Sequence, residues 1–124
     1  VMRTGLTPMT YSLQQFERDA ITRLCVAVID ETALSRILAE AEVVDVDHTG
    51  VGYFLTLRHS ELPTGKRTVD SPYLLGESGD VCVGFMVFLG DHELTLECFN
   101  LGTRDDVPLT VRELPLDLRV LEQS

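Results

Sequence analysis

The chain has 124 residues, of which 44% are hydrophobic, which suffices for one core and leaves no room for a second domain. We therefore expect residues 1–124 to form a single domain. Twenty acidic and ten basic side chains give a formal charge of −10, which argues against nucleic acid as a partner. The longest apolar stretches are far shorter than the roughly 20 residues that cross a bilayer, so no membrane association is expected.

The three cysteines, Cys25, Cys82 and Cys98, are an odd number and lie in apolar surroundings. This pattern is typical of buried thiols and not of a disulfide framework, which forms in oxidising compartments. We therefore expect a cytoplasmic protein.

Two amphipathic helices are predicted at the start of the chain. Residues 12–15 read Ser-Leu-Gln-Gln, a capping box in which side chains at both ends bond to free backbone amides. Apolar residues then recur at helical spacing, which predicts a helix over residues 13–27 with Glu17 among its solvated side chains. Asp30 is a favourable cap for a second helix that follows directly.

After the second helix, the apolar period changes from helical spacing to alternation. Val44 and Val46 alternate with Asp45 and Asp47, which predicts a strand, and a second strand is expected over residues 53–59. Residues 60–80 are rich in Ser, Pro and Gly, so we expect a long irregular connection, the first candidate for a variable binding segment.

The clearest strand signal is the hairpin formed by residues 81–89 and 93–101 around the turn residues Gly90 and Asp91. Its second strand alternates apolar with polar side chains, whereas its first strand is apolar on both faces. A last alternation over residues 114–120 contains Pro115, which predicts an edge strand.

Together these elements predict an α+β fold, with two N-terminal helices packed on one face of an antiparallel β-sheet of about four to five strands. The apolar stripe of the first helix is expected to contact the sheet face that bears Leu94 and Leu96. That stripe consists of Phe16, Ala20 and Leu24.

The glycine and aromatic residues of segments 50–54 and 84–97 resemble those of a group of small bacterial proteins of unassigned function. Members of this group begin with an amphipathic helix and end in a similar hairpin. The resemblance implies the same architecture here and carries over no catalytic residue.

Three short motifs have ordinary structural interpretations. Ser78 lies in a Gly-Glu-Ser-Gly-Asp turn that departs from the setting of a protease nucleophile at two positions. Residues 64–67 lack the upstream glycine of a phosphate loop. Asp45, Asp47 and His48 form the only compact set of metal ligands, but acidic residues are common on the solvated face of a strand. We predict no catalytic residue, no metal site and no cofactor.

The preferred interpretation is a non-enzymatic acidic protein that acts through protein–protein interaction. The strand that is apolar on both faces needs a second cover, and a homodimer supplies one through Met86 and Phe88, or through Phe85 and Val87 in the other register. The alternative is that residues 60–80 or residues 114–121 fold back over that face. The negative charge also favours another protein with a basic surface, in the manner of small immunity or inhibitor proteins.

The alternative is a small-molecule-binding domain or small enzyme with its pocket between the helices and the sheet. Its ligand-binding residues would be Tyr53, His59, Tyr73 and Glu97.

Overall fold

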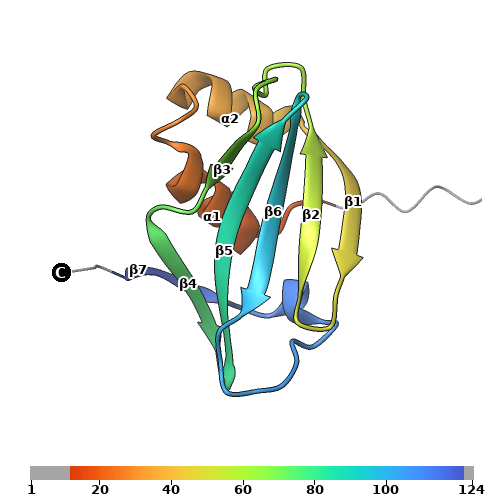
Figure 1. Cartoon of the computed structure of the whole chain (residues 1–124), viewed down its shortest axis with the longest axis vertical. Coiled ribbons are helices and arrows are strands. Elements are labelled where there is room, and N and C mark those ends of the chain that lie inside the picture. The colour runs from red at the N-terminus through yellow and green to blue at the C-terminus, as the bar shows by residue number, and fades with distance from the viewer. Residues whose placement is uncertain (1–11, 122–124) are drawn as a thin grey trace, which may run out of the picture.

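The computed structural model describes residues 12–121, which form an antiparallel sheet and two α-helices (Figure 1). The α+β class is confirmed, but the sheet has seven strands where four to five were predicted. In chain order the elements are α1 (Gln15–Cys25), α2 (Glu31–Glu40), β1 (Glu42–His48), β2 (Gly52–Arg58), β3 (Arg67–Val69), β4 (Tyr73–Ser78), β5 (Val81–Gly90), β6 (Glu93–Asn100), the 3₁₀ turn η1 (Val111–Glu113) and β7 (Asp117–Leu121).

The extra strands come from residues 60–80, which sequence composition had marked as irregular. The sheet order is β1-β2-β6-β5-β4-β7, and β3 also pairs with β5. β4 pairs with β5 at residues 81–84 and β3 pairs with it at residues 87–89, so two short strands share one edge of a long one. Such short strands depend on their long-range partner more than on local propensity, so composition did not reveal them.

Both helices begin at a side-chain cap. The predicted capping box of Ser12 and Gln15 is wrong, because α1 begins at Gln15, two residues later than the predicted helix, and its N-cap is Gln14. The capping box instead pairs Gln14 with Glu17, whose carboxylate accepts a hydrogen bond from the backbone N–H of Gln14 (2.8 Å). Asp30 caps α2 as predicted and accepts from the N–H of Ala33 (3.2 Å). Neither of the two described α-helices is long and apolar enough to span a membrane.

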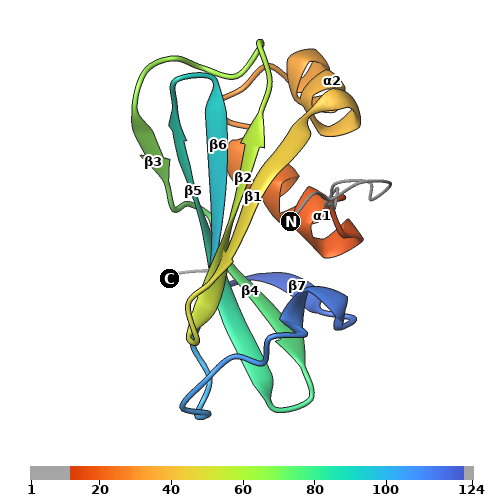
Figure 2. The same cartoon turned by 90° about the vertical axis from the view of Figure 1, so that its right-hand side faces the viewer.

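Both helices lie on the same side of the sheet, as Figure 2 shows, and we call this side the inner face and the opposite side the outer face. The predicted β5–β6 hairpin is confirmed. Its turn lies one residue later than predicted, because Gly90 is the last residue of β5 and pairs with Glu93. The turn residues Asp91 and His92 have φ values of 53° and 61°, which fit a type I′ turn. This register puts Val87 opposite Leu96, and both side chains are fully buried.

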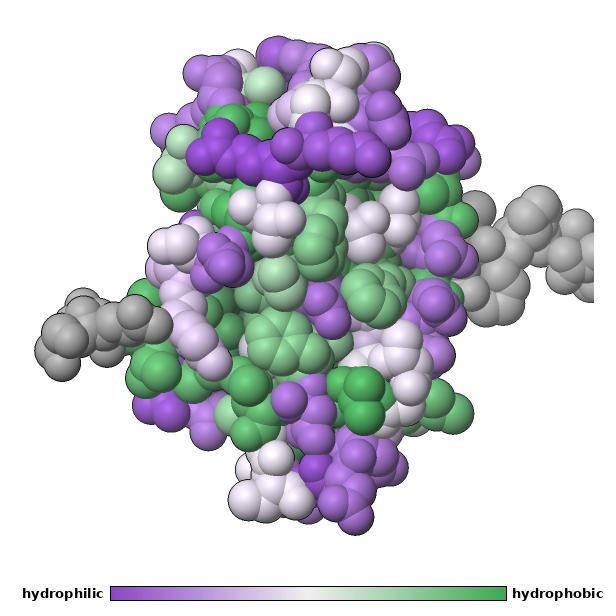
Figure 3. Space-filling model, in the orientation of Figure 1, coloured by the Kyte–Doolittle hydropathy of each residue, from purple (hydrophilic) through white to green (hydrophobic). Residues whose placement is uncertain are grey.

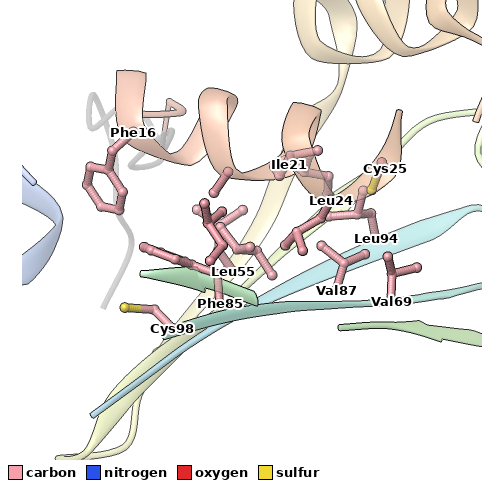
Figure 4. Packing of buried hydrophobic residues seen from close by; sticks show 14 of the residues in the cluster. Phe16, Ile21, Leu24, Cys25, Leu55, Val69, Phe85, Val87, Leu94 and Cys98 are labelled. Atoms are coloured by element: carbon pink, nitrogen blue, oxygen red, sulfur yellow. The ribbon is translucent and has the colours of Figure 1, made fainter. Parts of the chain in front are cut away.

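The core fills the space between α1 and the inner face (Figure 4). Side chains of α1 point down onto residues of β2, β5 and β6, and the ring centroids of Phe16 and Phe85 are 6.0 Å apart. Ala20 and Leu24 belong to the same buried cluster as Leu94 and Leu96. The inner face is therefore occupied by the core, whereas neither helix covers the outer face.

Candidate functional site

The middle of the outer face is apolar, and we call this area the apolar patch. Figure 3 shows it as a hydrophobic area over the centre of the sheet, with hydrophilic residues above and below it. Strand alternation brings its residues to the outer face. Phe88, which is 36% exposed, lies at the end of the patch where β5 pairs with Thr68 and Thr95. The patch consists of Phe54, Tyr73, Met86, Phe88, Phe99 and Leu101.

Gly84 allows two of these side chains to lie close over β5. A Cβ atom at this position would lie 2.6 Å from the ring of Phe99 and 2.8 Å from the side chain of Leu101. Both distances are shorter than van der Waals contact, so any larger residue would push these side chains outward. The glycine thus keeps this part of the patch flat.

A hollow of about 730 Å³ lies beside the apolar patch. The hollow lies at the edge of β5, between the part that pairs with β4 and the part that pairs with β3. The segment that connects β3 to β4 contains a cis peptide bond between Ser71 and Pro72. Polar side chains are few in its wall, which favours an apolar occupant. The hollow is lined by Asp70, Ser71, Pro72, Tyr73, Leu74, Phe85, Met86, Phe99, Val120 and Leu121.

One carboxylate lies inside the apolar patch. Glu97 on β6 is directly opposite Phe54 on β2 and Met86 on β5. Partial burial among these side chains raises the pKa of its carboxyl above the ordinary value. Within residues 12–121, no hydrogen bond or ion pair engages this carboxylate. Glu97 is therefore a partly desolvated acid that has no counter-ion in the described part of the chain.

The four residues predicted to bind a ligand do not converge. Tyr53 is 1% exposed on the inner face, where its hydroxyl donates to Glu17. His59 follows β2 and contacts Glu40 at the end of α2. Tyr73 and Glu97 lie on the outer face, so a pocket between helices and sheet cannot contain all four.

The four predicted interface residues divide between the two faces. Phe85 and Val87 are buried in the core against α1, with exposed fractions of 3% and 0%. Met86 and Phe88 are accessible on the outer face. Of the two alternatives left open by the sequence, the structure therefore leaves only the Met86 and Phe88 row available for contact.

The residues of β1 considered as metal ligands, Asp45, Asp47 and His48, do not lie on one face of the sheet. Asp45 and Asp47 lie on the outer face, whereas His48 pairs with Tyr53, and their ring centroids are 5.7 Å apart. Among residues 12–121, the group able to converge on one ion is a different one, Glu40, His59 and Glu61.

Internal contacts already occupy the atoms of this second group. The Nδ1 atom of His59 accepts from the backbone N–H of Glu61 (3.0 Å), so Nε2 carries the proton and donates to Glu40 (2.9 Å). Arg36 donates twice to the carboxylate of Glu61, at 2.6 Å each, and lowers the pKa of that carboxyl. We interpret this group as a cluster in which the hydrogen bond of His59 with Glu40 and the ion pair of Glu61 with Arg36 join α2 to the segment that follows β2.

Sequence reasoning missed a buried polar network that joins α1, the inner face of the sheet and η1. Glu17 is fully buried, and its carboxylate accepts from the hydroxyl of Tyr53 (2.6 Å) and from Nε of Arg112 (2.7 Å). Arg112 also donates to the backbone carbonyl of Ser12 (2.7 Å). The expectation that Glu17 is solvated is therefore wrong, because Arg112 supplies a counter-ion from the far end of the chain. This network is part of the core, and it leaves the apolar patch as the candidate site.

Comparisons with protein-family models, with curated proteins and with solved structures gave no match for this chain, so the site is interpreted from its own geometry.

Proposed function

We propose that this protein is a docking module that binds another polypeptide on the outer face of its sheet. The observation that supports the proposal is the apolar patch, because large contiguous apolar areas on soluble proteins mark interaction sites. Nothing within residues 12–121 covers this area, and both helices lie on the opposite side. A second copy of the chain is one polypeptide that such a face admits.

The side chains that line the hollow also favour a binding function over a catalytic one. A catalytic pocket needs a nucleophile or an acid–base pair held by further polar groups. The hollow offers Asp70 and the hydroxyls of Ser71 and Tyr73 against a wall of aliphatic and aromatic side chains. Such a cavity suits an apolar side chain of a partner better than a reacting substrate.

A peptide-display experiment tests the proposal with the purified protein. A random library of 12-residue peptides is selected on the wild type, and each enriched peptide is then measured on Met86→Asp and Phe88→Asp. Either change places a charge inside the apolar patch, so we expect binding to fall at least about tenfold. Leu109→Asp is the matched control, since Leu109 is 72% exposed and is not part of the patch.

Amide chemical shifts of the labelled protein should map the bound peptides to β2, β5 and β6. Enriched peptides that bind the two patch variants as tightly as the wild type, or that map to the helices, would refute the proposal.

A further inference from the structure

We propose that the partner docked on the outer face presents a basic side chain, Arg or Lys, that pairs with Glu97 beside an apolar side chain seated in the hollow. This inference rests on the docking function proposed above. It specifies the chemistry of the partner, which the apolar patch alone does not.

The position of Glu97 carries the inference. A docked partner would remove the remaining water from a carboxylate that already lies between Phe54 and Met86. Such burial opposes binding unless the partner brings a donor for the carboxylate. A guanidinium or ammonium group satisfies this requirement, and aromatic rings stabilise a nearby cation further. Phe54 lies directly opposite Glu97, and Phe99 lies two positions further along β6 on the same face.

The hollow determines which kind of partner side chain lies next to this basic side chain. Met86 takes part in both features, since it lines the hollow and is directly opposite Glu97. Neighbouring strands are about 5 Å apart, so the hollow beside β5 and the carboxylate on β6 are separated by roughly one to two strand spacings. In an extended peptide, side chains two positions apart are separated by about 7 Å and fit this interval.

The charge of the molecule supports a basic partner over a second copy. The chain has a formal charge of −10, and Asp45 and Asp47 are exposed on the same face as Glu97. A symmetric dimer joins the same surface of both copies, so an axis through the patch centre would bring Glu97 close to its own counterpart. Two facing carboxylates disfavour that arrangement at neutral pH.

The test compares peptide selections on three forms of the protein. The library of 12-residue peptides is selected in parallel on the wild type, on Glu97→Gln and on Glu113→Gln, and peptides that still bind Met86→Asp are discarded. Glu97→Gln keeps the side-chain shape and removes the charge. Glu113→Gln removes one charge from an exposed position on η1, so the net charges of the two variants are equal.

We expect the wild-type and Glu113→Gln selections to be enriched in Arg or Lys close to an apolar residue, and the Glu97→Gln selection to lose this enrichment. Replacing the basic residue of a wild-type peptide by citrulline, which is neutral and similar in shape, should weaken binding roughly five- to tenfold on the wild type and little on Glu97→Gln.

Two results would overturn the inference and leave the docking function intact. One is a set of peptides that bind the patch without a basic residue, and the other is equal basic enrichment on all three forms. A concentration-dependent dimer in light scattering, dissociated by Met86→Asp, would assign the face to a second copy instead. If no selected peptide depends on Met86, the docking function itself is refuted.

Discussion

Replacing Glu17 by alanine is the sharpest test of the buried network. The substitution removes the acceptor of the Tyr53 hydroxyl and the counter-ion of Arg112, whose side chain is only 12% exposed. Removing one partner of a buried ion pair costs about 3–5 kcal/mol, and an orphaned buried hydroxyl costs about 1–3 kcal/mol. The two costs overlap, and Arg112 can recover some hydration, so we expect a loss of about 3–4 kcal/mol in the free energy of unfolding.

Urea unfolding followed by circular dichroism measures this loss at 25 °C. Glu113→Ala serves as the control because Glu113 is exposed, and it should change stability by less than about 0.5 kcal/mol. The double variant Glu17→Met with Arg112→Met should recover part of the loss, because it removes both charges and refills the space. A Glu17→Ala protein within about 1 kcal/mol of the wild type, at an unchanged urea slope, would refute the reasoning.

Three further outcomes follow from burial and charge. Glu97→Gln should raise the melting temperature at pH 7, because the raised pKa of Glu97 means that its ionisation opposes folding. The difference should vanish below about pH 4, where the carboxyl is protonated in both states, and a difference that persists there would contradict this cause. Leu96→Ala, at a fully buried position, should lower the free energy of unfolding by about 2–5 kcal/mol, and an unmoved urea midpoint would show that Leu96 lies outside the core. Ellman's reagent at pH 8 should label Cys82 first, because Cys82 is only partly buried whereas Cys25 and Cys98 are buried. Burial raises the pKa of all three thiols, that of Cys25 to about 12, so faster labelling of Cys25 or Cys98 would contradict their burial.

The parts of the fold that could be predicted depend on nearby residues. The β5–β6 hairpin is confirmed because its turn and its alternation lie within 20 consecutive residues. The Asp30 cap is confirmed for the same reason. β3 and β4 were missed because their pairing with β5 outweighs a local composition that is typical of loops.

The candidate site could be predicted in part. Alternation along β5 identified Met86 and Phe88 as one row, but only the observed register shows which row faces the core. Glu97 was predicted as a ligand-binding residue, although nothing in the sequence shows that Phe54 lies across from it.

A signal for Glu17 was present and was misread. Its position is four residues after Leu13 and three or four before Ala20 and Ile21, which places it in the centre of the apolar stripe of α1. A charge at such a position indicates a buried partner. The partner itself, Arg112, is 95 positions away, and no pattern within the helix could identify it.

The 95 positions between Glu17 and Arg112 limit the order in which the chain can fold during synthesis on the ribosome. The first helix leaves the ribosome early, yet the guanidinium that neutralises Glu17 is made 95 residues later. Until then, docking α1 on the sheet would bury an uncompensated charge, which is unfavourable enough to keep the helix from settling. A nascent chain that ends just before Arg112 should therefore remain sensitive to protease, even though most of its strands have already been synthesised.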